Sequence, residues 1–298
     1  MEIIKPGTRI PFLSYRRWGF MLSSALIIGV ALLLFTKGPN LGVDFEGGTM
    51  VHVKLPESVT IGDLRDALQQ SPLGGVVQDF GGGGTNEYLI RMEKSETEIG
   101  TVGRDIRAVL DQSFGAGKYE VLRVESVGPK VGDDLRRRGI LSVIFATIMM
   151  GAYIWIRFEL RFGLGAIVAL IHDVLITVGA LVVAGFEFDL PIVAALLTIA
   201  GYSVNDTVVI CDRIRENMRK KRRDSMENII NTSINETLGR TILTTITSLL
   251  VLTALLILGG GVIRPFAYTL FVGFLAGLYS TVFVATPIIL LLERGRRR

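Results

Sequence analysis

The sequence predicts a polytopic α-helical membrane protein with six transmembrane helices and a small α+β domain between the first and second helices. Two observations lead to this fold class. Apolar residues make up 49% of the 298-residue chain, and the mean hydropathy is +0.48, above the usual range of soluble domains. These apolar residues gather in six long runs, and a mixed stretch of about 100 residues separates the first two runs. Each run is long enough to span hydrocarbon about 30 Å thick.

The chain begins with a basic arm, residues 1–17, that precedes the first predicted span, residues 18–36. We expect the span to be retained, because no small-residue cleavage site follows it. Positive charges before a span favour the cytosolic side of a membrane, so the N-terminus is predicted to be cytosolic. The charges of the arm are those of Lys5, Arg9, Arg16 and Arg17.

Residues 37–138 are predicted to form an extracytoplasmic α+β domain. Helical spacing predicts helices at 61–70 and 96–114, and alternation predicts strands at 50–55, 76–80, 88–92 and 119–127. The order β-α-β-β-α-β is that of a ferredoxin-like split unit. The GGGG run at 81–84 is not a phosphate loop, because no Lys-Ser/Thr pair and no helix start follow it.

The segment that opens this domain reads LGVDFEGG, residues 41–48. Gly47 and Gly48 are interpreted as the turn that enters the first strand. Asp44 and Glu46 resemble a carboxylate pair, but two acids near a turn are usually solvated or cap a helix. We therefore find no catalytic constellation in this domain.

Five more spans are predicted at 139–156, 163–184, 190–211, 241–258 and 266–292, the last of which tilts or bends near Pro287. Six spans place both termini in the cytosol. The predicted cytosolic segments contain four, two, seven and four Lys/Arg residues, while the outer hairpins contain none and one. The run 136–138, three arginines on the predicted outer side, departs from this rule.

The cytosolic link 212–240 combines a basic stretch, 213–223, with an amphipathic stretch, 225–238. Two placements of the amphipathic stretch are open. It lies on the membrane surface, where Lys and Arg meet anionic headgroups, or it packs on the cytosolic mouth of the bundle. Residues 293–298 form a basic cytosolic tail.

Polar residues interrupt three consecutive spans, where an isolated charge costs roughly 2.5–3.5 kcal/mol. Taken singly, each has an ordinary explanation: threonines bond to their own helix, an arginine near a span end snorkels, and an interior histidine is usually satisfied. Together they cannot all face lipid, so we expect them to converge on a protein-lined or wet interior. The candidates for a proton pathway are Asp206, Arg240, Asn205, Asp173, His172 and Thr244.

This combination predicts a proton relay in which Arg240 holds Asp206 ionised until helix movement or hydration lets the carboxylate take a proton. A proton crossing the membrane potential supplies about 2.3 kcal/mol per 100 mV. Enzymatic chemistry is not expected, because HExxH and GxSxG motifs are missing from the sequence. The single cysteine, Cys211, forms neither an intrachain disulfide nor a zinc site, and no cofactor other than the proton is expected.

Five motifs, spread along nearly the whole chain, resemble the SecF proteins of the SecD/SecF protein-export family. They are LGVDFEGG (41–48), VGPKVGDDLRRRGI (127–140), RFELRFGLGAIVALIHDVLIT (157–177), GYSVNDTVVICDRIREN (201–217) and ETLGRTILTT (236–245). SecD proteins have similar motifs but usually a much larger outer domain. The short insert of this chain therefore favours the SecF branch.

The resemblance implies a fold that is one half of a resistance-nodulation-division (RND) transporter. It also implies SecD as a partner, association with the SecYEG channel and possibly with YajC. The family uses the proton-motive force to promote export after SecA has pushed the preprotein into the channel. The resemblance further implies that Asp206 and Arg240 conduct protons and that His172 and Asp173 match a family HD pair. The family motif at the entry to the outer domain falls on Asp44, Phe45, Gly47 and Gly48, with Glu46 where Thr is frequent.

A polar inner face needs a second six-helix half to cover it, so an obligate partner is expected on burial grounds as well. The alternative function is half of an RND-type proton-coupled exporter of lipids or small molecules. The small outer domain argues against that alternative, because such exporters have larger domains with substrate pockets.

Overall fold

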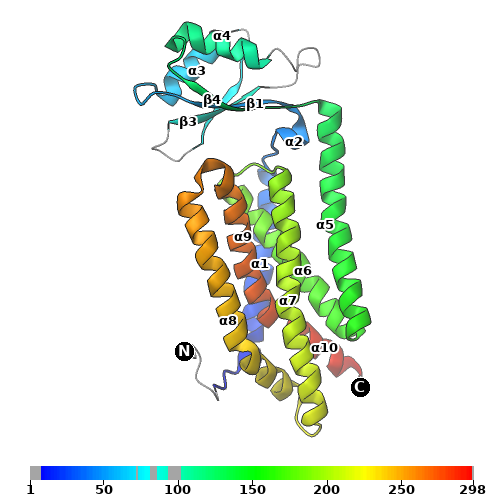
Figure 1. Ribbon diagram of the computed structural model, residues 1–298. Helices are drawn as coiled ribbons and strands as arrows, with labels where there is room; N and C mark the ends of the chain where they lie inside the picture. Colours follow the sequence, from blue (N-terminus) through cyan, green and yellow to red (C-terminus); the bar gives the residue numbers. More distant parts are fainter. Residues whose placement is uncertain (1–7, 72, 81–85, 93–101, 297–298) are drawn as a thin grey trace.

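The computed structural model describes residues 8–71, 73–80, 86–92 and 102–296. A bundle of long helices carries a four-stranded sheet with two helices at one end (Figure 1). Within the described residues, six helices are long and apolar enough to cross a membrane, as predicted. The chain is therefore a multi-pass membrane protein.

The first span is preceded by a short 3₁₀ turn, Phe12–Tyr15, and the last is completed by a π-helical turn, Thr281–Ala285. The long helices are α1 (Arg16–Thr36), α5 (Pro129–Arg157), α6 (Leu160–Ala184), α7 (Leu190–Lys220), α8 (Met226–Leu258), α9 (Gly260–Ser280) and α10 (Thr286–Arg296).

Helix α5 begins ten residues before the predicted span, at Pro129 rather than at residue 139. Proline suits the first position of a helix, because the N–H it lacks has no partner there. Arg136 contacts Asp133 at 3.1 Å and Arg138 contacts Asp134 at 2.8 Å, one turn apart on this extension. The arginine run that departs from the charge rule is thus partly neutralised by acids of its own helix.

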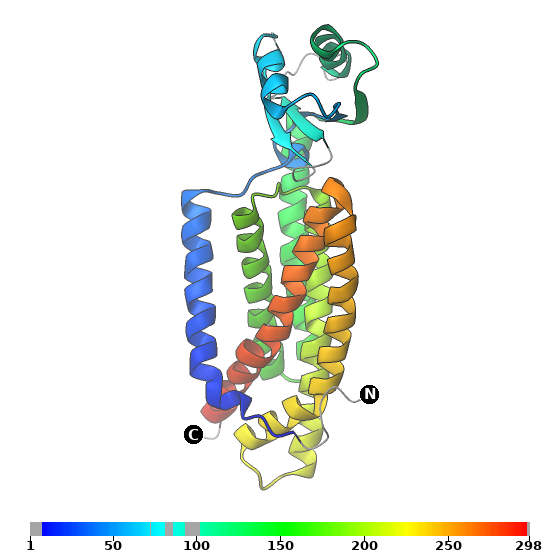
Figure 2. The same cartoon turned by 90° about the vertical axis from the view of Figure 1, so that its left-hand side faces the viewer.

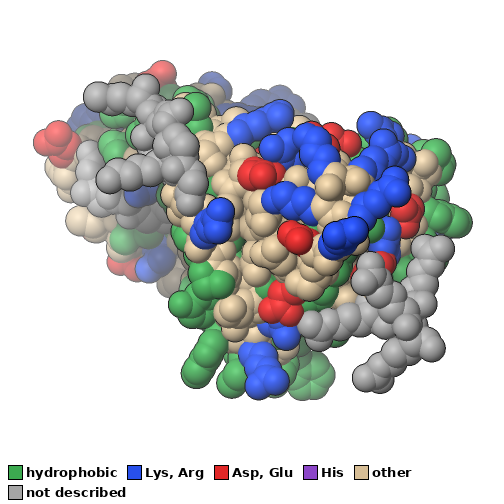
Figure 3. Space-filling model, turned by 90° about the horizontal axis from the view of Figure 1, so that it is seen from below, with side chains coloured by type: hydrophobic (Ala, Val, Ile, Leu, Met, Phe, Trp, Pro, Cys, Tyr) green, Lys and Arg blue, Asp and Glu red, His purple; other side chains and the backbone are tan. Residues whose placement is uncertain are grey.

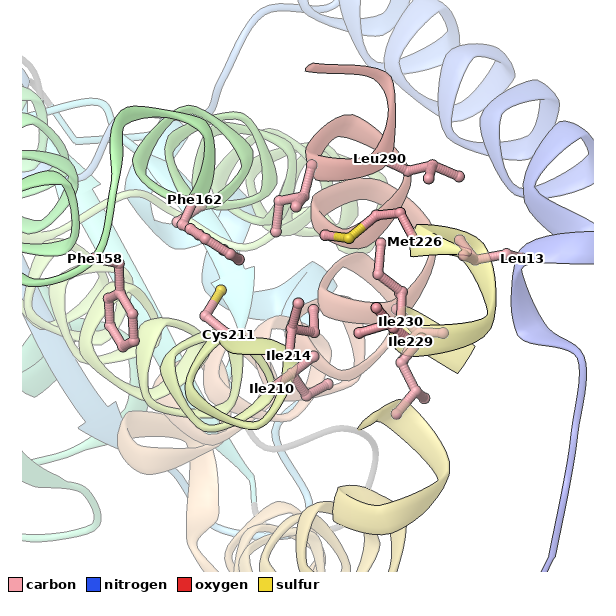
Figure 4. Packing of buried hydrophobic residues seen from close by; sticks show 14 of the residues in the cluster. Leu13, Phe158, Phe162, Ile210, Cys211, Ile214, Met226, Ile229, Ile230 and Leu290 are labelled. Atoms are coloured by element: carbon pink, nitrogen blue, oxygen red, sulfur yellow. The ribbon is translucent and has the colours of Figure 1, made fainter. Parts of the chain in front are cut away.

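Helix α8 is continuous from Met226, so the predicted amphipathic stretch and the fifth span are one helix. Ser225 caps its start by accepting a hydrogen bond from the Asn228 N–H at 3.2 Å. Its first turns pack on the end of the bundle that lies far from the sheet, against apolar residues of α6, α7 and the N-terminal turn (Figure 4). The structure therefore selects packing on the bundle mouth over a position on the membrane surface. The residues labelled in this cluster include Met226, Ile229, Ile230, Leu13, Phe162, Ile210 and Ile214.

The sixth span is interrupted close to the predicted position. Pro287 follows the π-helical turn Thr281–Ala285. A proline ring inside a helix clashes with the carbonyl four residues earlier, here that of Phe283, and a widened turn relieves the clash. The interruption therefore takes the form of one π turn between α9 and α10.

The sheet domain follows the order β1 (Gly48–Lys54), α3 (Ile61–Gln69), β2 (Val76–Asp79), β3 (Glu87–Met92), α4 (Val102–Phe114) and β4 (Glu120–Val127). This is the predicted order of strands and helices. The strands pair antiparallel in the order β2-β3-β1-β4. The glycine run 81–84 and the predicted start of the second helix, 96–101, lie outside the described residues.

Helices α3 and α4 cover the face of the sheet that points away from the bundle (Figure 1). Alternate strand residues such as Val51, Val53 and Ile90 are fully buried beneath them. The opposite face looks onto the end of the bundle across a cleft of about 400 Å³. Met50, His52, the α6–α7 connection and the first turns of α9 line this cleft.

The start of α1 and the end of α10 lie at the end of the bundle opposite the sheet (Figure 2). Lys and Arg side chains gather on that end (Figure 3). Seven of them lie at the end of α7 and in the connection to α8: Arg213, Arg215, Arg219, Lys220, Lys221, Arg222 and Arg223.

Candidate functional site

A buried carboxyl group, that of Asp173 on α6, is the centre of a polar cluster inside the bundle. Its exposed fraction is 0%. Ser203 of α7 and Ser280 of α9 donate to Oδ2 at 2.6 and 2.8 Å. Oδ1 lies 3.0 Å from Nδ1 of His172. Three helices therefore supply the partners that a buried carboxyl group needs.

Two glycines of α9 allow α7 and α9 to approach closely enough for these bonds. A Cβ at Gly277 would lie 3.1 Å from Ser203 Cβ, and one at Gly273 would lie 2.2 Å from the end of the Ile199 side chain. Glycines four residues apart are a common means of close helix packing in membranes. Gly273 and Gly277 therefore permit the close approach of α7 and α9.

His172 is buried, with an exposed fraction of 3%, and only one of its ring nitrogens is hydrogen-bonded among the described residues. Nδ1 faces Asp173, while Nε2 has no partner there. The ring stacks on Tyr279 of α9, with centroids 5.9 Å apart. It also lines an apolar cavity of about 330 Å³ between α1, α6 and α9. Because its lining is almost wholly apolar, this cavity offers a water molecule few hydrogen-bonding partners.

Asp206 lies on α7 and is 5% exposed. Its carboxylate makes no hydrogen bond within the part of the chain that the structure describes. The guanidinium group of Arg240 on α8 lies close enough to interact electrostatically with this carboxylate, but the two groups do not form an ion pair and the Arg240 side chain is exposed. The Asp206 carboxylate therefore lies near a positive charge but makes no direct contact with it.

Contrary to the prediction, Asn205 and Thr244 do not point into the interior of the bundle. Both residues are exposed on the outside of this chain. The Thr244 hydroxyl bonds to carbonyls of its own helix, those of Arg240 and Thr241, each at 3.0 Å. Tyr202 of α7 donates to the Thr244 carbonyl at 3.1 Å and so ties α7 to α8. The predicted pathway is thus split into a buried cluster at Asp173 and a polar face that this chain leaves uncovered. We call the latter the open polar face: Asn205, Arg240, Thr244 and Thr247.

The motif at the entry to the sheet domain joins the domain to the bundle. The Asp44 carboxylate accepts a hydrogen bond from the Leu190 N–H at 3.0 Å, at the start of α7, so this acid caps a helix. Phe45 is 4% exposed and packs into the apolar core at the same end of the bundle. Both residues lie in α2 (Val43–Glu46), a single turn between α1 and the sheet.

Gly47 and Gly48 form the predicted entry turn, with φ values of +75° and +118° that favour glycine. A Cβ at Gly47 would lie 2.9 Å from Pro129 Cα, the first residue of α5. Next to this turn Glu46 forms an ion pair with Arg91 of β3, which also donates to the Leu41 carbonyl at 2.8 Å. Glu46, the departure from the family pattern, thus holds the sheet to the linker.

In the sixth span, the sequence reasoning missed Tyr279, Ser280 and Thr281, which contact the cluster. Thr281 lies 3.1 Å from Thr207 of α7, oxygen to oxygen, next to the Ser280 bond to Asp173. Three consecutive hydroxyl residues in the sixth span were the available signal. Such residues are usually bonded to their own helix, so the signal is weak without the fold.

The described residues contain no group of three or more His, Cys, Asp or Glu side chains that could hold a metal ion.

Two family descriptions match the chain. "Protein export membrane protein SecD/SecF, C-terminal" matches residues 107–295, and "SecD/SecF GG Motif" matches residues 32–55. The protein translocase subunit SecF of Calditerrivibrio nitroreducens is 41% identical over 100% of this chain and 99% of its own length. That of Magnetococcus marinus is 44% identical over 100% of this chain and 96% of its own.

Two solved structures are similar as well. A crystal structure of SecDF, described as a translocon-associated membrane protein from Thermus thermophilus, matches with a TM-score of 0.87 and 34% identity over 97% of this chain. The chain spans 39% of that solved chain. A crystal structure of SecDF in a super-membrane-facing form matches with a TM-score of 0.73 and 34% identity, over 100% of this chain and 40% of the solved one.

Proposed function

Because the chain belongs to the SecD/SecF family of protein-export membrane proteins, we propose that it is a non-enzymatic translocase subunit that couples the proton-motive force to late steps of preprotein export. The single observation that carries the export role is identity of 41% over the full length of a protein translocase subunit SecF. No observation favours the alternative of a lipid or small-molecule exporter.

The proton part of the proposal rests on two buried carboxyl groups. Asp173 and Asp206 lie on adjacent membrane helices, α6 and α7, and are 0% and 5% exposed. A carboxyl group in this setting is costly unless it is partnered or functional. Asp173 has three polar partners, whereas Asp206 has only the nearby charge of Arg240. Asp206 is therefore the stronger candidate for the group that gains and loses a proton.

In this mechanism Arg240 favours the ionised form of Asp206 when it is near, and the acid takes up a proton when helix movement weakens that interaction. Asn205 and Thr244 lie on the same open polar face, where they line the route once a partner covers it. Each proton that follows the route releases about 2.3 kcal/mol per 100 mV of membrane potential, which drives the next movement.

A SecD-type subunit is the proposed partner, in association with the SecYEG channel and with preproteins delivered by SecA; YajC is a further candidate subunit. Asn205, Arg240, Thr244 and Thr247 are exposed on membrane helices of this chain, and such groups are stable in a membrane only beside protein or water. The solved SecDF chain is about two and a half times as long as this one, which leaves room for a second half.

The proposed site of action is a bacterial cytoplasmic membrane, with both termini in the cytosol and a ferredoxin-like domain outside. The Lys and Arg side chains that gather at the end opposite the sheet support this orientation (Figure 3). The βαββαβ order and the strand order β2-β3-β1-β4 support the ferredoxin-like assignment.

The test is the substitution Asp206→Asn, which keeps the size of the side chain and removes its charge. In cells that lack the native protein, export of a slow preprotein is followed with and without a proton gradient. We expect export to fall to the level of the deletion strain and to stop responding to the gradient. The matched control is Asp212→Asn, an exposed acid on the same helix, which should export normally.

Co-purification with SecD must be retained in both variants, so that a failure to assemble is not mistaken for a loss of coupling. If Asp206→Asn exports normally and still responds to the gradient, the proton role moves to Asp173, and Asp173→Asn is tested in the same way. If neither acid matters, the proton-coupling proposal is wrong.

A further inference from the structure

The end of α9 is a short segment that touches three other membrane helices through consecutive side chains. Tyr279 donates to the Gly19 carbonyl of α1 at 2.8 Å. Ser280 donates to Asp173 of α6 at 2.8 Å, and the Thr281 hydroxyl lies 3.1 Å from that of Thr207 on α7. A shift of this segment therefore changes contacts to α1, α6 and α7 at once.

Tyr279 is joined to the Asp173 cluster in two ways. It precedes Ser280 in the chain, and its ring stacks on His172 with an interplanar angle of 27°. His172 in turn bonds to Asp173 through Nδ1. A change in the charge or position of the Asp173 carboxyl group therefore reaches Tyr279 through its neighbour in the chain and through the stacked ring.

Tyr279 is one of the side chains that attach helix α1 to the bundle, and it does so near the start of that helix. Gly19 and Ser23 are the buried residues of α1, and both contact Tyr279: its hydroxyl bonds to the Gly19 carbonyl and lies 3.1 Å from that of Ser23. Most of the rest of α1 faces outwards. The helix then leads through a short link to Gly42, whose N–H donates to the Phe188 carbonyl at the joint with the sheet domain.

The segment has two features of an element with alternative arrangements. It continues into the π-helical turn Thr281–Ala285, and π turns inside helices are frequent at functional sites. The Ser280 hydroxyl also has a second acceptor, the Gly277 carbonyl at 3.3 Å. Because a hydroxyl has one proton, Ser280 donates to Asp173 or to Gly277, and the choice depends on the state of the carboxyl group.

We propose that Tyr279 is a positioning residue that couples the state of the Asp173 cluster to the position of α1, and through α1 to the sheet domain. The inference rests on the proposed function, since it assumes that Asp173 changes state during transport. It assigns the transmission step to the Tyr279 hydroxyl, which is the group that bonds to α1.

The test measures the position of α1 directly by electron paramagnetic resonance between two spin labels. Phe35 at the end of α1 and Leu258 at the end of α8 are 91% and 83% exposed and accept labels without disturbing the core. Both are changed to cysteine in a Cys211→Ser background, and the labelled chain is studied in membranes together with its partner. The distance distribution is compared with and without Asp173→Asn, which imitates the protonated carboxyl group.

We expect Asp173→Asn to shift the distance distribution and Tyr279→Phe to abolish that shift. Tyr279→Phe keeps the ring on His172 and removes only the hydroxyl. The matched control is Tyr268→Phe, a second tyrosine of α9 beside the same cavity, whose hydroxyl makes no hydrogen bond within the described part of the chain. It should leave the shift intact. If Asp173→Asn does not assemble, Ser280→Ala replaces it, because it removes one bond to the same carboxyl group.

A shift that persists unchanged in Tyr279→Phe would overturn the inference, and so would the lack of any shift with Asp173→Asn or Ser280→Ala. Export assays on the same variants and on Asp206→Asn separate this inference from the proposed function. If export depends on the acids but the distances are not coupled, only the role of Tyr279 fails. If the distances are coupled but export is indifferent to both acids, the proton-coupling proposal fails.

Discussion

At the scale of single residues, four aspartates differ in burial and in hydrogen-bond partners. Asp173 is fully buried with three polar partners, and Asp206 is nearly buried with none among the described residues. Asp44 and Asp189 lie at the end of the bundle near the sheet and cap the start of α7 by accepting from Leu190 and Ile192. Position in the sequence separates Asp173 and Asp206, which lie inside apolar runs, from Asp44 and Asp189, which lie outside them, but it does not show which of the two buried acids has partners.

Asp189 provides a prediction about pH. Burial raises the pKa of this carboxyl group to about 6, from an ordinary value of 3.8, and the charges of Asp44 and Glu187 act in the same direction. The folded state therefore holds this proton more tightly than the unfolded state. Its contribution to stability, of the order of 3 kcal/mol, is full below pH 4 and is lost as the pH rises through about 6.

The change that tests this is Asp189→Asn, which keeps an oxygen to accept from the Ile192 N–H at 2.9 Å. We expect the variant to gain stability relative to the parent chain as the pH is raised from 4 to 8, because it has no charge to bury. Melting temperatures of the purified protein across this range measure the difference. Parallel curves for the two proteins would show that burial does not perturb Asp189.

At the scale of elements, the joint between sheet domain and bundle depends on the close approach of α2, β1 and α5. Gly47 has φ of +75°, and a Cβ there would lie 2.9 Å from the backbone of Pro129. From the other side, a Cβ at Gly132 of α5 would lie 2.9 Å from the backbone nitrogen of Gly47. Backbone atoms cannot swing aside as side chains do, so the space at this joint is fixed.

Gly47→Ala tests this joint against a matched control, Gly38→Ala. Gly38 has a similar φ of +68°, but nothing lies within 4 Å of the position of an added Cβ. The control should cost about 1–2 kcal/mol from backbone strain alone. Gly47→Ala should cost clearly more, because it adds the clash with Pro129, and it should make the connection to the domain more sensitive to limited proteolysis. Equal losses of thermal stability in the two variants would contradict the proposed packing.

The same joint shows how far sequence reasoning reaches. Gly47 and Gly48 were predicted to turn the chain, because paired glycines before an alternating stretch are typical of a strand entry. The contact of Gly47 with Pro129 could not be predicted, because it joins residues 82 positions apart. For the same reason the sequence pointed to Asp173 and Asp206 but not to Ser280, whose importance comes entirely from the helix it faces.

At the scale of the whole molecule, the bundle has one side that is not finished. Asn205, Arg240, Thr244 and Thr247 lie exposed on α7 and α8. Helix α1 lies on the opposite side of the bundle from α8 (Figure 2). We therefore expect a partner to pack against α7 and α8 of this chain, where it would cover these polar groups.

Crosslinking tests this placement. In a Cys211→Ser background, Thr247→Cys should crosslink to the partner subunit in membranes, because the residue faces the proposed interface. Leu32→Cys on α1, which is 60% exposed, is the control and should remain free of that crosslink. The products are identified by the gain in mass on a denaturing gel and by mass spectrometry. Efficient crosslinking from position 32 and none from 247 would place the partner on the other side.

The open polar face also bears on the life of the chain before assembly. A copy that enters the membrane alone exposes Asn205 and Arg240 to hydrocarbon or draws water in to meet them, at a cost of a few kcal/mol for the charge. The exposed polar face distinguishes a subunit without a partner from an assembled one. We expect membrane proteases that act on poorly inserted helices to degrade the subunit that has no partner. The cellular amount of this chain would then follow the supply of its partner, whatever the rate at which the chain itself is made.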